Sequence, residues 1–567
     1  MPPKQHPIED FAPLFQPDAY AEGDIWRLAP FFTNLDKSVY VPLVFAPELI
    51  GALCSRTSRA AHDLRSIYLK EFIQPFVEPV RDAKDTDETW QEKVKHGEAL
   101  KAFIEFLHKH SLQELFANPR ARSFYVKWLA EYGDDSIAQM AGAHLVYTGL
   151  SQIAIKHLED QRIGLAPIEK STRYVNYSQK IHGQYMYYTD PTLKDLGLEE
   201  KYRTAMDGLF ATYTALIPRM IAWLQVKYPN EKPSVVEKKA FDTLRGLLPA
   251  STLSQVSFFG NGQAFEYMVS RSGAHSLGEI RWAARRAQEE LNHIVPSFLR
   301  RLEKETAHEY QEYLAERGKR LEPYVLDALK PLVTAETKPE VRLVEYDPDG
   351  ENKVIAAMLY MAPHNHRAWN ETLACVRGMS MDEKRRVLSA YLKGRNARWQ
   401  KIGRAFENVY VRFEITMNIG GWRDLHRHRM LTHMRQDFSC FHGYDMPREI
   451  VEAGLANEFA SAIQPIGEVF HAIHAHDSYL AQYAVTLSHR LRFMQWQNLR
   501  SLSWTTELRT IPEGHPDYRH IEQEKFRLIE KIYPLIAECL LVNLGEYDFA
   551  RRGQEERIQR KQQELAS

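Results

Sequence analysis

Residues 425–447, "LHRHRMLTHMRQDFSCFHGYDMP", gather arginine and histidine but contain no lysine. Arg427, His428 and Arg429 are consecutive, and four more arginines or histidines lie in the same stretch. A solvated basic face uses lysine as freely as arginine, whereas arginine and histidine make directional, planar contacts. The stretch therefore indicates recognition of an anionic or aromatic ligand. The alternative reading is a helix face whose charges are paired with local carboxylates.

The composition is that of a globular protein with no global electrostatic bias. The chain has 567 residues, of which 44% are hydrophobic and 26% charged, and its formal net charge is −1. We therefore expect two or more domains and no nucleic-acid partner. The first residues lack the pattern of a signal peptide and no apolar run approaches a membrane span, so no membrane association is expected. Four scattered cysteines in no metal-type spacing predict a reduced, cytoplasmic protein.

Hydrophobic periodicity predicts a helix-rich α+β fold. Apolar residues recur at helical spacing over residues 58–76, 198–225 and 280–318. Three further segments have the alternation or the β-forming residues of strands: 183–190, 341–346 and 410–417. The second of these begins a pattern of strand, turn and helix.

The charge distribution predicts where the domains divide. Residues 301–340 are highly charged, which is typical of a helical linker. We expect an N-terminal domain with a helical extension over residues 1–300 and a C-terminal domain over residues 341–567.

The two halves resemble each other in order rather than in identity. Residues 133–178 and 403–447 both run from a polar loop through an apolar segment into a polar cluster. Further along, Arg271 and Arg509 each follow a helix-like run, and a histidine follows each, His275 and His515. The pattern predicts a divergent tandem repeat.

These residues resemble the flavin-dependent thymidylate synthases. The family signature is an Arg-His-Arg triplet followed, about seven residues later, by Ser-x-Arg-Tyr. Arg427–Arg429 match the triplet in the second half, and Ser171–Tyr174 match Ser-x-Arg-Tyr in the first. The missing counterparts are Asp160–Arg162 and Asp437–Cys440. Further similar positions are Arg271, His275, Glu279, Arg281, Glu407, Asn498, Arg500 and Arg509.

The resemblance implies two tandem thymidylate-synthase-like domains and an enzyme that converts dUMP to dTMP. FAD would be the cofactor, with NADPH and methylenetetrahydrofolate as co-substrates. The cofactor would be bound by Arg427, His428, Arg429 and Glu407. The nucleotide would be bound by Ser171, Arg173, Tyr174, Arg271, Arg281 and Arg509, with Arg173 and Arg281 also acting in catalysis. Family sites are assembled from several subunits, so the resemblance implies a homodimer that forms a pseudo-tetramer.

Other readings of the same residues stay open. A non-catalytic scaffold or sensor that keeps a nucleotide or flavin is the second function, since each half lacks one signature. Arg271, Arg281 and Arg509 can instead pair with nearby carboxylates such as Glu266, Glu279 and Glu507. The histidines of "HAIHAHD" (471–477) lack a third ligand of recognisable spacing, so no metal site is expected. Cys440 is expected to be inert rather than catalytic.

Overall fold

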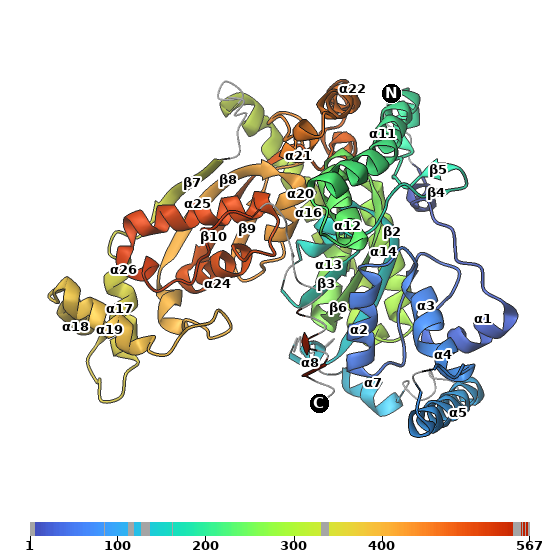
Figure 1. Ribbon diagram of the computed structural model, residues 1–567, viewed down its shortest axis with the longest axis horizontal. Helices are drawn as coiled ribbons and strands as arrows, with labels where there is room; N and C mark the ends of the chain where they lie inside the picture. Colours follow the sequence, from blue (N-terminus) through green and yellow to red (C-terminus); the bar gives the residue numbers. More distant parts are fainter. Residues whose placement is uncertain are drawn as a thin grey trace. The chain divides into compact units, whose positions relative to one another are not determined.

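The computed structural model describes residues 6–83, 85–110, 118–125, 127, 136–161, 163–329, 340–547, 557, 560, 561, 563 and 564. The chain forms two compact units, Met1–Thr334 with Pro447–Thr486, and Ala335–Met446 with Leu487–Ser567. Each unit is built on one four-stranded antiparallel sheet with helices packed against it (Figure 1). The predicted α+β class, with a small sheet in each of two related halves, is confirmed. The domain boundaries expected at residues 300 and 341 describe the two sequence repeats and stay a prediction. The compact units are a different division of the chain, because residues 447–486 join the first unit.

The two sheets have the same topology. The first has the order β1-β2-β6-β3, and the second has the order β7-β8-β10-β9. Their strands are β1 Val39–Tyr40, β2 Gly142–Ser151, β3 Leu165–Glu169, β6 Leu253–Asn261, β7 Glu340–Tyr346, β8 Tyr410–Asn418, β9 Thr432–Arg435 and β10 Arg490–Asn498. A separate hairpin joins β4 Lys180–Ile181 to β5 Gln184–Tyr185.

The helices carry most of the described chain. In the first unit they are α1 Glu22–Leu28, α2 Pro47–Thr57, α3 Leu64–Ile67, α4 Gln74–Val77, α5 Asp87–Lys109, α7 Pro119–Tyr125, α8 Ser136–Gln139, α9 Gln152–Glu159, α10 Thr192–Asp195, α11 Glu199–Lys227, α12 Pro233–Leu244, α13 Gly262–Gly273, α14 Gly278–Asn292, α15 Pro296–Leu299, α16 Glu305–Ala328, α21 Arg448–Glu452, α22 Ala456–His474 and α23 Ser478–Ala481. In the second they are α17 Gly350–Tyr360, α18 Trp369–Arg377, α19 Met381–Tyr391, α20 Ile419–Leu425, α24 Leu499–Arg509, α25 Pro516–Ile532 and α26 Pro534–Ala537.

Most of the predicted elements are present. Helices occupy most of each periodic segment, and residues 341–346 and 410–417 lie in β7 and β8. The strand predicted at 183–190 is wrong except at Gln184–Tyr185. Its alternating tyrosines instead pack on α11, with the rings of Tyr185 and Tyr187 5.2 and 5.9 Å from that of Phe210.

In each repeat, two strands run directly into helices without an intervening loop. At each junction a side-chain oxygen of the last strand residue accepts a hydrogen bond from the first helical turn. These four caps are Ser151 to Ala154 N at 3.0 Å, Asn261 to Ala264 N at 2.8 Å, Asn418 to Gly421 N at 2.7 Å and Asn498 to Ser501 N at 2.9 Å. Capping satisfies N–H groups that a helix cannot pair internally. The repeat is therefore visible as a pair of capped junctions in each half.

The segment 447–486 belongs to the second repeat along the chain but completes the first unit. Its helix α22 packs along α11, where Arg219 Nη1 donates to Glu458 Oε1 at 2.8 Å. Beyond α22, Ala250 N donates to Val485 O at 2.6 Å, which continues the backbone pairing between Pro249 and Thr486. Corresponding parts of the two repeats thus pack against each other inside one unit.

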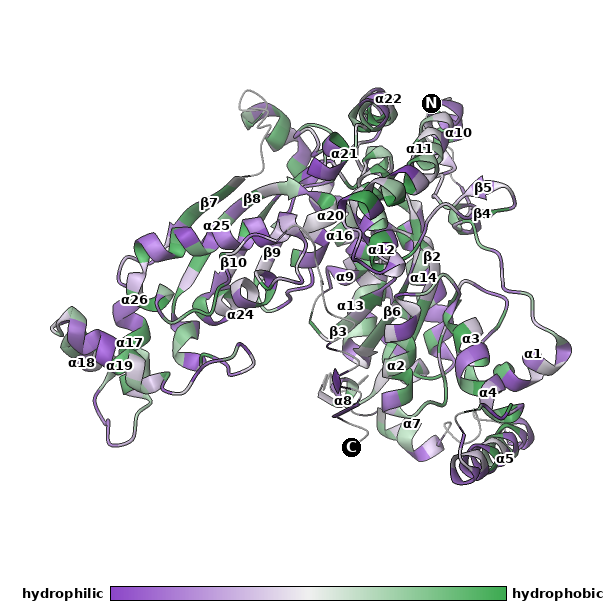
Figure 2. Cartoon of the chain, viewed as in Figure 1, coloured by the Kyte–Doolittle hydropathy of each residue, from purple (hydrophilic) through white to green (hydrophobic). Residues whose placement is uncertain are grey.

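The N-terminal segment has its own apolar core, which continues into the first sheet. Leu28, Phe31, Tyr40 and Leu64 are buried there and share the cluster with Val146 of β2. The helix α5 is mainly hydrophilic (Figure 2), and only Gly97, Ile104 and Leu107 are buried among its residues.

Replacing two capping asparagines of the second unit should have unequal effects. Asn418 Nδ2 also donates to Asp445 at 3.0 Å and to Asp517 at 2.7 Å, while among the described residues the side chain of Asn498 makes only its capping bond. We expect Asn498→Ala to lower the free energy of unfolding by about 1 kcal/mol and Asn418→Ala by about 3 kcal/mol, because the latter also removes one hydrogen bond from each of two carboxylates. Urea denaturation followed by tryptophan fluorescence measures both; equal losses would contradict the role of the two carboxylates.

Candidate functional site

The Arg-His-Arg triplet follows directly on α20, the short helix that starts at the capped Asn418. His428 is buried, and its Nε2 accepts a hydrogen bond of 2.8 Å from Arg509 Nε. Because an arginine only donates, the proton of this imidazole is on Nδ1. Asp424 Oδ1 lies 3.8 Å from Arg427 Nε and 4.0 Å from Arg509 Nη1. One carboxylate therefore faces two guanidinium groups.

The neighbouring histidines have a different role from the triplet. His433 accepts a 2.9 Å hydrogen bond from Trp422 Nε1 and stacks on Phe493 with ring centroids 4.9 Å apart. His426 is buried against Trp422 at 4.6 Å. These two rings belong to the packing behind the triplet. The cluster seen in the sequence thus separates into His426 and His433, which pack on aromatic rings, and the triplet, which contacts Arg509 and Asp424.

A cavity of about 330 Å³ lies beside the triplet in the second unit. Its walls include Glu407, Asn498 and Arg500, which the sequence analysis identified as family-like positions, and Met430, which follows the triplet directly. Glu407 accepts hydrogen bonds from Arg404 and Arg500, and these bonds, that of Arg500 foremost, lower the pKa of the carboxyl. The structure therefore brings these family-like positions together around one cavity.

Three cations of this cavity were missed in the sequence. Arg395, Arg398 and Lys401 come from residues 392–403, which join α19 to the short 3-10 helix Arg404–Asn408. The run "LKGRNARWQKIGR" is rich in arginine, as the triplet segment is, but unlike that segment it also contains lysine. The density of positive charge in this run was the feature of the sequence that could have identified the three cations.

In the first unit, the Ser-x-Arg-Tyr element follows β3. Ser171 Oγ accepts from Arg173 N at 3.1 Å, and Arg173 donates to both oxygens of Asp242 at 2.9 and 2.8 Å. The guanidinium of Arg173 also lies 5.9 Å from the centroid of the Tyr174 ring. The element is therefore held rigidly by α12.

Arg245, which sequence reasoning missed, joins this cluster. Its Nε lies 3.4 Å from Asp242 Oδ1, and its side chain is only 6% exposed. Within the described residues its Nη2 is buried and has no hydrogen-bond partner. Arg173 and Arg245 thus share one carboxylate, and one buried donor is left for an anion.

The remaining predicted arginines do not pair with the carboxylates proposed as alternatives. Arg271 Nη1 is 3.5 Å from Gln161 Oε1, and Arg281 Nη1 donates to the backbone carbonyls of His275 at 2.7 Å and Ser276 at 2.6 Å. Glu266 pairs with Arg301, Glu279 with Ser151 and Tyr483, and Glu507 with Arg395.

The sheet register relates the two halves residue by residue. Pro167 pairs with Phe258 and His433 with Gln495, and each partner lies three residues before a capping asparagine. Asp437 therefore occupies the place of Ser171.

Counted from the same caps, Arg509 matches Ser272 rather than Arg271. Arg271 and Arg509 still contact equivalent positions, since Gln161 and His428 lie ten residues after the caps Ser151 and Asn418. Arg162, at the triplet place of the first half, lies outside the described residues.

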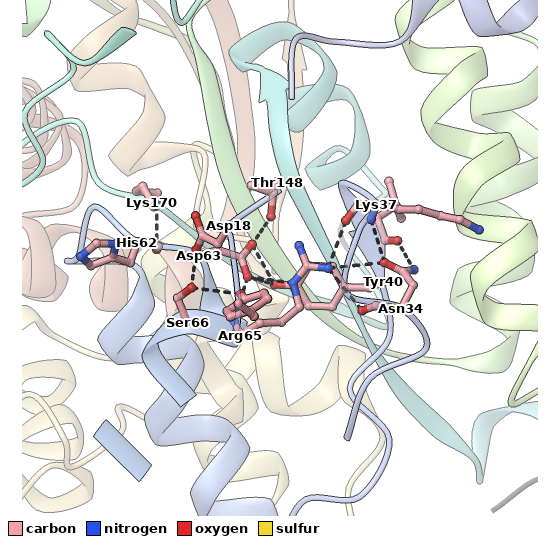
Figure 3. Close-up of polar contacts among 12 residues, drawn as sticks. Asp18, Asn34, Lys37, Tyr40, His62, Asp63, Arg65, Ser66, Thr148 and Lys170 are labelled. Carbon is pink, nitrogen blue, oxygen red and sulfur yellow. Dashed lines mark hydrogen bonds and ion pairs between the residues drawn. The ribbon is translucent and has the colours of Figure 1, made fainter. Parts of the chain in front are cut away.

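The N-terminal segment supports the Ser-x-Arg-Tyr element from the other side. Lys170 Nζ donates to the carbonyls of Ala61 at 2.8 Å and His62 at 3.1 Å (Figure 3). Asp63 accepts from Thr148 Oγ1 at 2.7 Å and from Arg65 Nε at 3.0 Å, which ties the segment to β2. Residues before 130 thus contact the residue that leads into the Ser-x-Arg-Tyr element.

No helix within the described ranges is long and apolar enough to cross a membrane. Over the same ranges, no three His, Cys, Asp or Glu side chains form a group that could hold a metal ion. Burial raises the pKa of the Cys440 thiol to about 12, which opposes formation of the thiolate nucleophile.

Glu279 should make the stability of the first unit depend on pH. It is buried, accepts from Ser151 N at 2.8 Å, Ser151 Oγ at 2.6 Å and Tyr483 OH at 2.8 Å, and burial raises its pKa from 4.5 to about 7. The folded state then holds this proton to higher pH than the unfolded chain, so stability falls as pH rises from 4.5 to about 7. The loss is about 3 kcal/mol.

The neutral Glu279→Gln variant should lose this dependence. We expect its unfolding midpoint to change less between pH 5 and pH 8 than that of the parent chain, as measured by thermal unfolding in matched buffers. An equal pH dependence in both proteins would show that Glu279 does not carry the effect.

Comparison with known proteins places these motifs in a family. The model described as "thymidylate synthase complementing protein" matches residues 87–297 and 342–535. UPF0159 proteins of Chlamydia pneumoniae and Chlamydia muridarum are 32% and 33% identical to the chain over 544 and 546 residues. Each alignment covers 94% of this chain, and 96% and 97% of the relatives. A UPF0159 protein of Thermoplasma acidophilum is 29% identical over 77% of this chain and 92% of its own.

Among solved structures, a UMP/dUMP methylase of Streptomyces cacaoi bound with 5-Br dUMP is similar over 36% of this chain and 96% of its own. The identity is 15% and the TM-score 0.28, which is too low to locate a ligand in the present chain.

Proposed function

Because the chain belongs to the flavin-dependent thymidylate synthase family, we propose that it methylates a pyrimidine deoxynucleotide, converting dUMP to dTMP. Methylenetetrahydrofolate would supply the carbon and NADPH would reduce the flavin. The observation that carries the proposal is the cation-lined cavity in which Glu407, Asn498 and Arg500 meet Met430, the residue that follows the Arg-His-Arg triplet.

The donor set of this cavity fits FAD. A flavin dinucleotide presents a diphosphate and flat aromatic rings, which arginines recognise through paired hydrogen bonds and stacking. Arg427 and Arg429 would hold the phosphates, and His428 would be oriented by its hydrogen bond from Arg509. When bound, the flavin supplies the hydride for the reaction. The residues of the chain bind and orient it.

The residues around Ser171 fit the nucleotide. Ser171, Arg173, Tyr174 and the buried Arg245 Nη2 would surround its phosphate, since Asp242 neutralises only one of the two arginines. Arg281 uses Nη1 for two backbone carbonyls. Its other guanidinium donors would face the uracil carbonyl and stabilise the negative charge that develops there.

The two repeats would divide the binding between them, with flavin contacts in the second and nucleotide contacts in the first. A homodimer that forms a pseudo-tetramer is part of the proposal. The pairing of α11 with α22 supports it, because the repeats already pack against each other as two family subunits would.

Flavin binding should depend on the triplet. We expect the purified chain to bind FAD with a yellow absorbance that shifts when dUMP is added. The Arg427→Gln/Arg429→Gln variant should bind FAD at least tenfold more weakly, through the loss of charged hydrogen bonds that contribute about 1.5–3 kcal/mol each. Arg386→Gln, which removes an exposed cation of α19, is the matched control. Undiminished FAD affinity in the double variant would remove the triplet from the site.

Nucleotide binding should depend on Arg245. We expect Arg245→Gln to weaken dUMP at least tenfold while changing deoxyuridine, which lacks the phosphate, much less. Isothermal titration on the FAD-loaded chain measures both ligands. Equal losses for the two ligands would indicate a folding defect instead of a lost phosphate contact, and an unchanged dUMP affinity would exclude Arg245 from the site.

A non-catalytic flavin- or nucleotide-binding protein is the second candidate. It is favoured by the double hydrogen bond between Arg173 and Asp242, which occupies the guanidinium that the family motif offers to a phosphate. The discriminating experiment is turnover: dTMP formed from dUMP, methylenetetrahydrofolate, NADPH and FAD supports the enzyme. Bound ligands with no product support the scaffold.

A further inference from the structure

The segment between α19 and the 3-10 helix Arg404–Asn408 separates two cavities of the second unit. One is the 330 Å³ cavity described above, and the other has a volume of about 350 Å³. Arg395, Lys401 and Ile402 line both. The two cavities therefore meet at an edge that carries positive charge.

Arg395 anchors this segment and is not available to a ligand. It donates through Nη2 to both oxygens of the buried Glu507 at 2.8 and 2.6 Å, through Nε to Gln400 O at 2.8 Å and through Nη1 to Cys539 O at 3.1 Å. Gln400 Oε1 in turn accepts from the backbone N–H groups of Asn396 and Ala397. The segment is thus pre-organised, which reduces the entropic cost of binding on its surface.

Arg398 and Lys401 are the cations that this arrangement leaves without a carboxylate. The two carboxylates of the cavity are already engaged, Glu507 by Arg395 and Glu407 by Arg404 and Arg500. Within the described residues, no ion pair or hydrogen bond is formed by the side chain of Arg398 or of Lys401. A cavity wall with two unpaired cations calls for an anionic ligand.

The surroundings of Lys401 strengthen this conclusion. Its Nζ lies 3.1 Å from the centroid of the Trp504 ring, so the ammonium is in cation–π contact. Burial and the positive charges of Arg398, Arg500 and Arg395 lower the pKa of the amine. An anion placed between Arg398 and Lys401 would relieve this repulsion.

We propose that Arg398 and Lys401 form a diphosphate clamp for the dinucleotide cofactor, whose two halves occupy the two cavities. The inference rests on the proposed function for the identity of the dinucleotide. A dinucleotide fits because its paired charges lie between two ring systems, as Lys401 lies between two cavities with Arg398 in the wall of the first. Each cavity alone is at the lower end of the volumes usual for small-molecule sites.

Ligands with and without the diphosphate test the clamp. Binding of FAD, riboflavin, ADP and adenosine is measured by fluorescence or calorimetry on the full chain and on Arg398→Gln, Lys401→Gln and the double variant. We expect each single variant to weaken FAD and ADP at least tenfold and to leave riboflavin and adenosine unchanged. The exposed Arg386→Gln change serves again as the control, and thermal unfolding verifies that each variant is folded.

The outcomes separate the clamp from the proposed function. Unchanged FAD and ADP affinities in the folded double variant overturn the clamp. Equal weakening of the phosphate-free ligands also overturns it, because the segment then acts through cavity shape. If the parent chain binds ADP through these residues but binds no flavin, the clamp stands and the flavin-dependent function fails.

Discussion

A β-strand that continues directly into a helix presents the first-turn N–H groups of that helix at the edge of the sheet, where they need an acceptor. This chain meets the requirement four times with a serine or asparagine at the last strand position. In each repeat one of these caps is itself held by a carboxylate from the helix behind it, Glu279 on Ser151 and Asp517 on Asn418. The site depends on this arrangement because the triplet follows α20 directly, and Asn498 and Arg500 lie at another capped junction.

The same scaffold carries different polar chemistry in the two repeats. The sheet register shows that the first repeat has one residue more between its cap Ser151 and the aligned position of β3 than the second has between its cap Asn418 and the aligned position of β9. Once this difference is allowed for, Ser171 and Asp437 occupy matching places. Counted from the caps of their helices, the positions of Arg271 and Arg509 differ by one residue. The two arginines nevertheless contact equivalent partners, Gln161 and His428. Side chains on a preserved backbone can thus exchange roles without a change of topology.

Sequence periodicity could predict the amphipathic helices because one face of each packs on apolar neighbours and the other meets water. It could not predict β6, which is buried at nearly every position and has no alternation to detect. Motif spacing found Arg173 and the triplet. It could not find Arg245, since its partner Asp242 is 69 positions from Arg173 in the sequence and only the fold brings the two together. The histidines near the triplet looked alike in the sequence, but Trp422 and Phe493 draw His433 into the core.

The chain is almost neutral overall, yet each of its candidate sites brings two cations together. Arg173 and Arg245 share Asp242, Arg427 and Arg509 share Asp424, and Arg398 and Lys401 have no carboxylate among the described residues. Placing like charges together in a folded protein is unfavourable unless something of opposite sign completes the group. A polyanionic ligand, as proposed, is the kind of group that would complete such clusters. Under the proposed function, these local groups of cations, rather than the net charge, would mark where the phosphates bind.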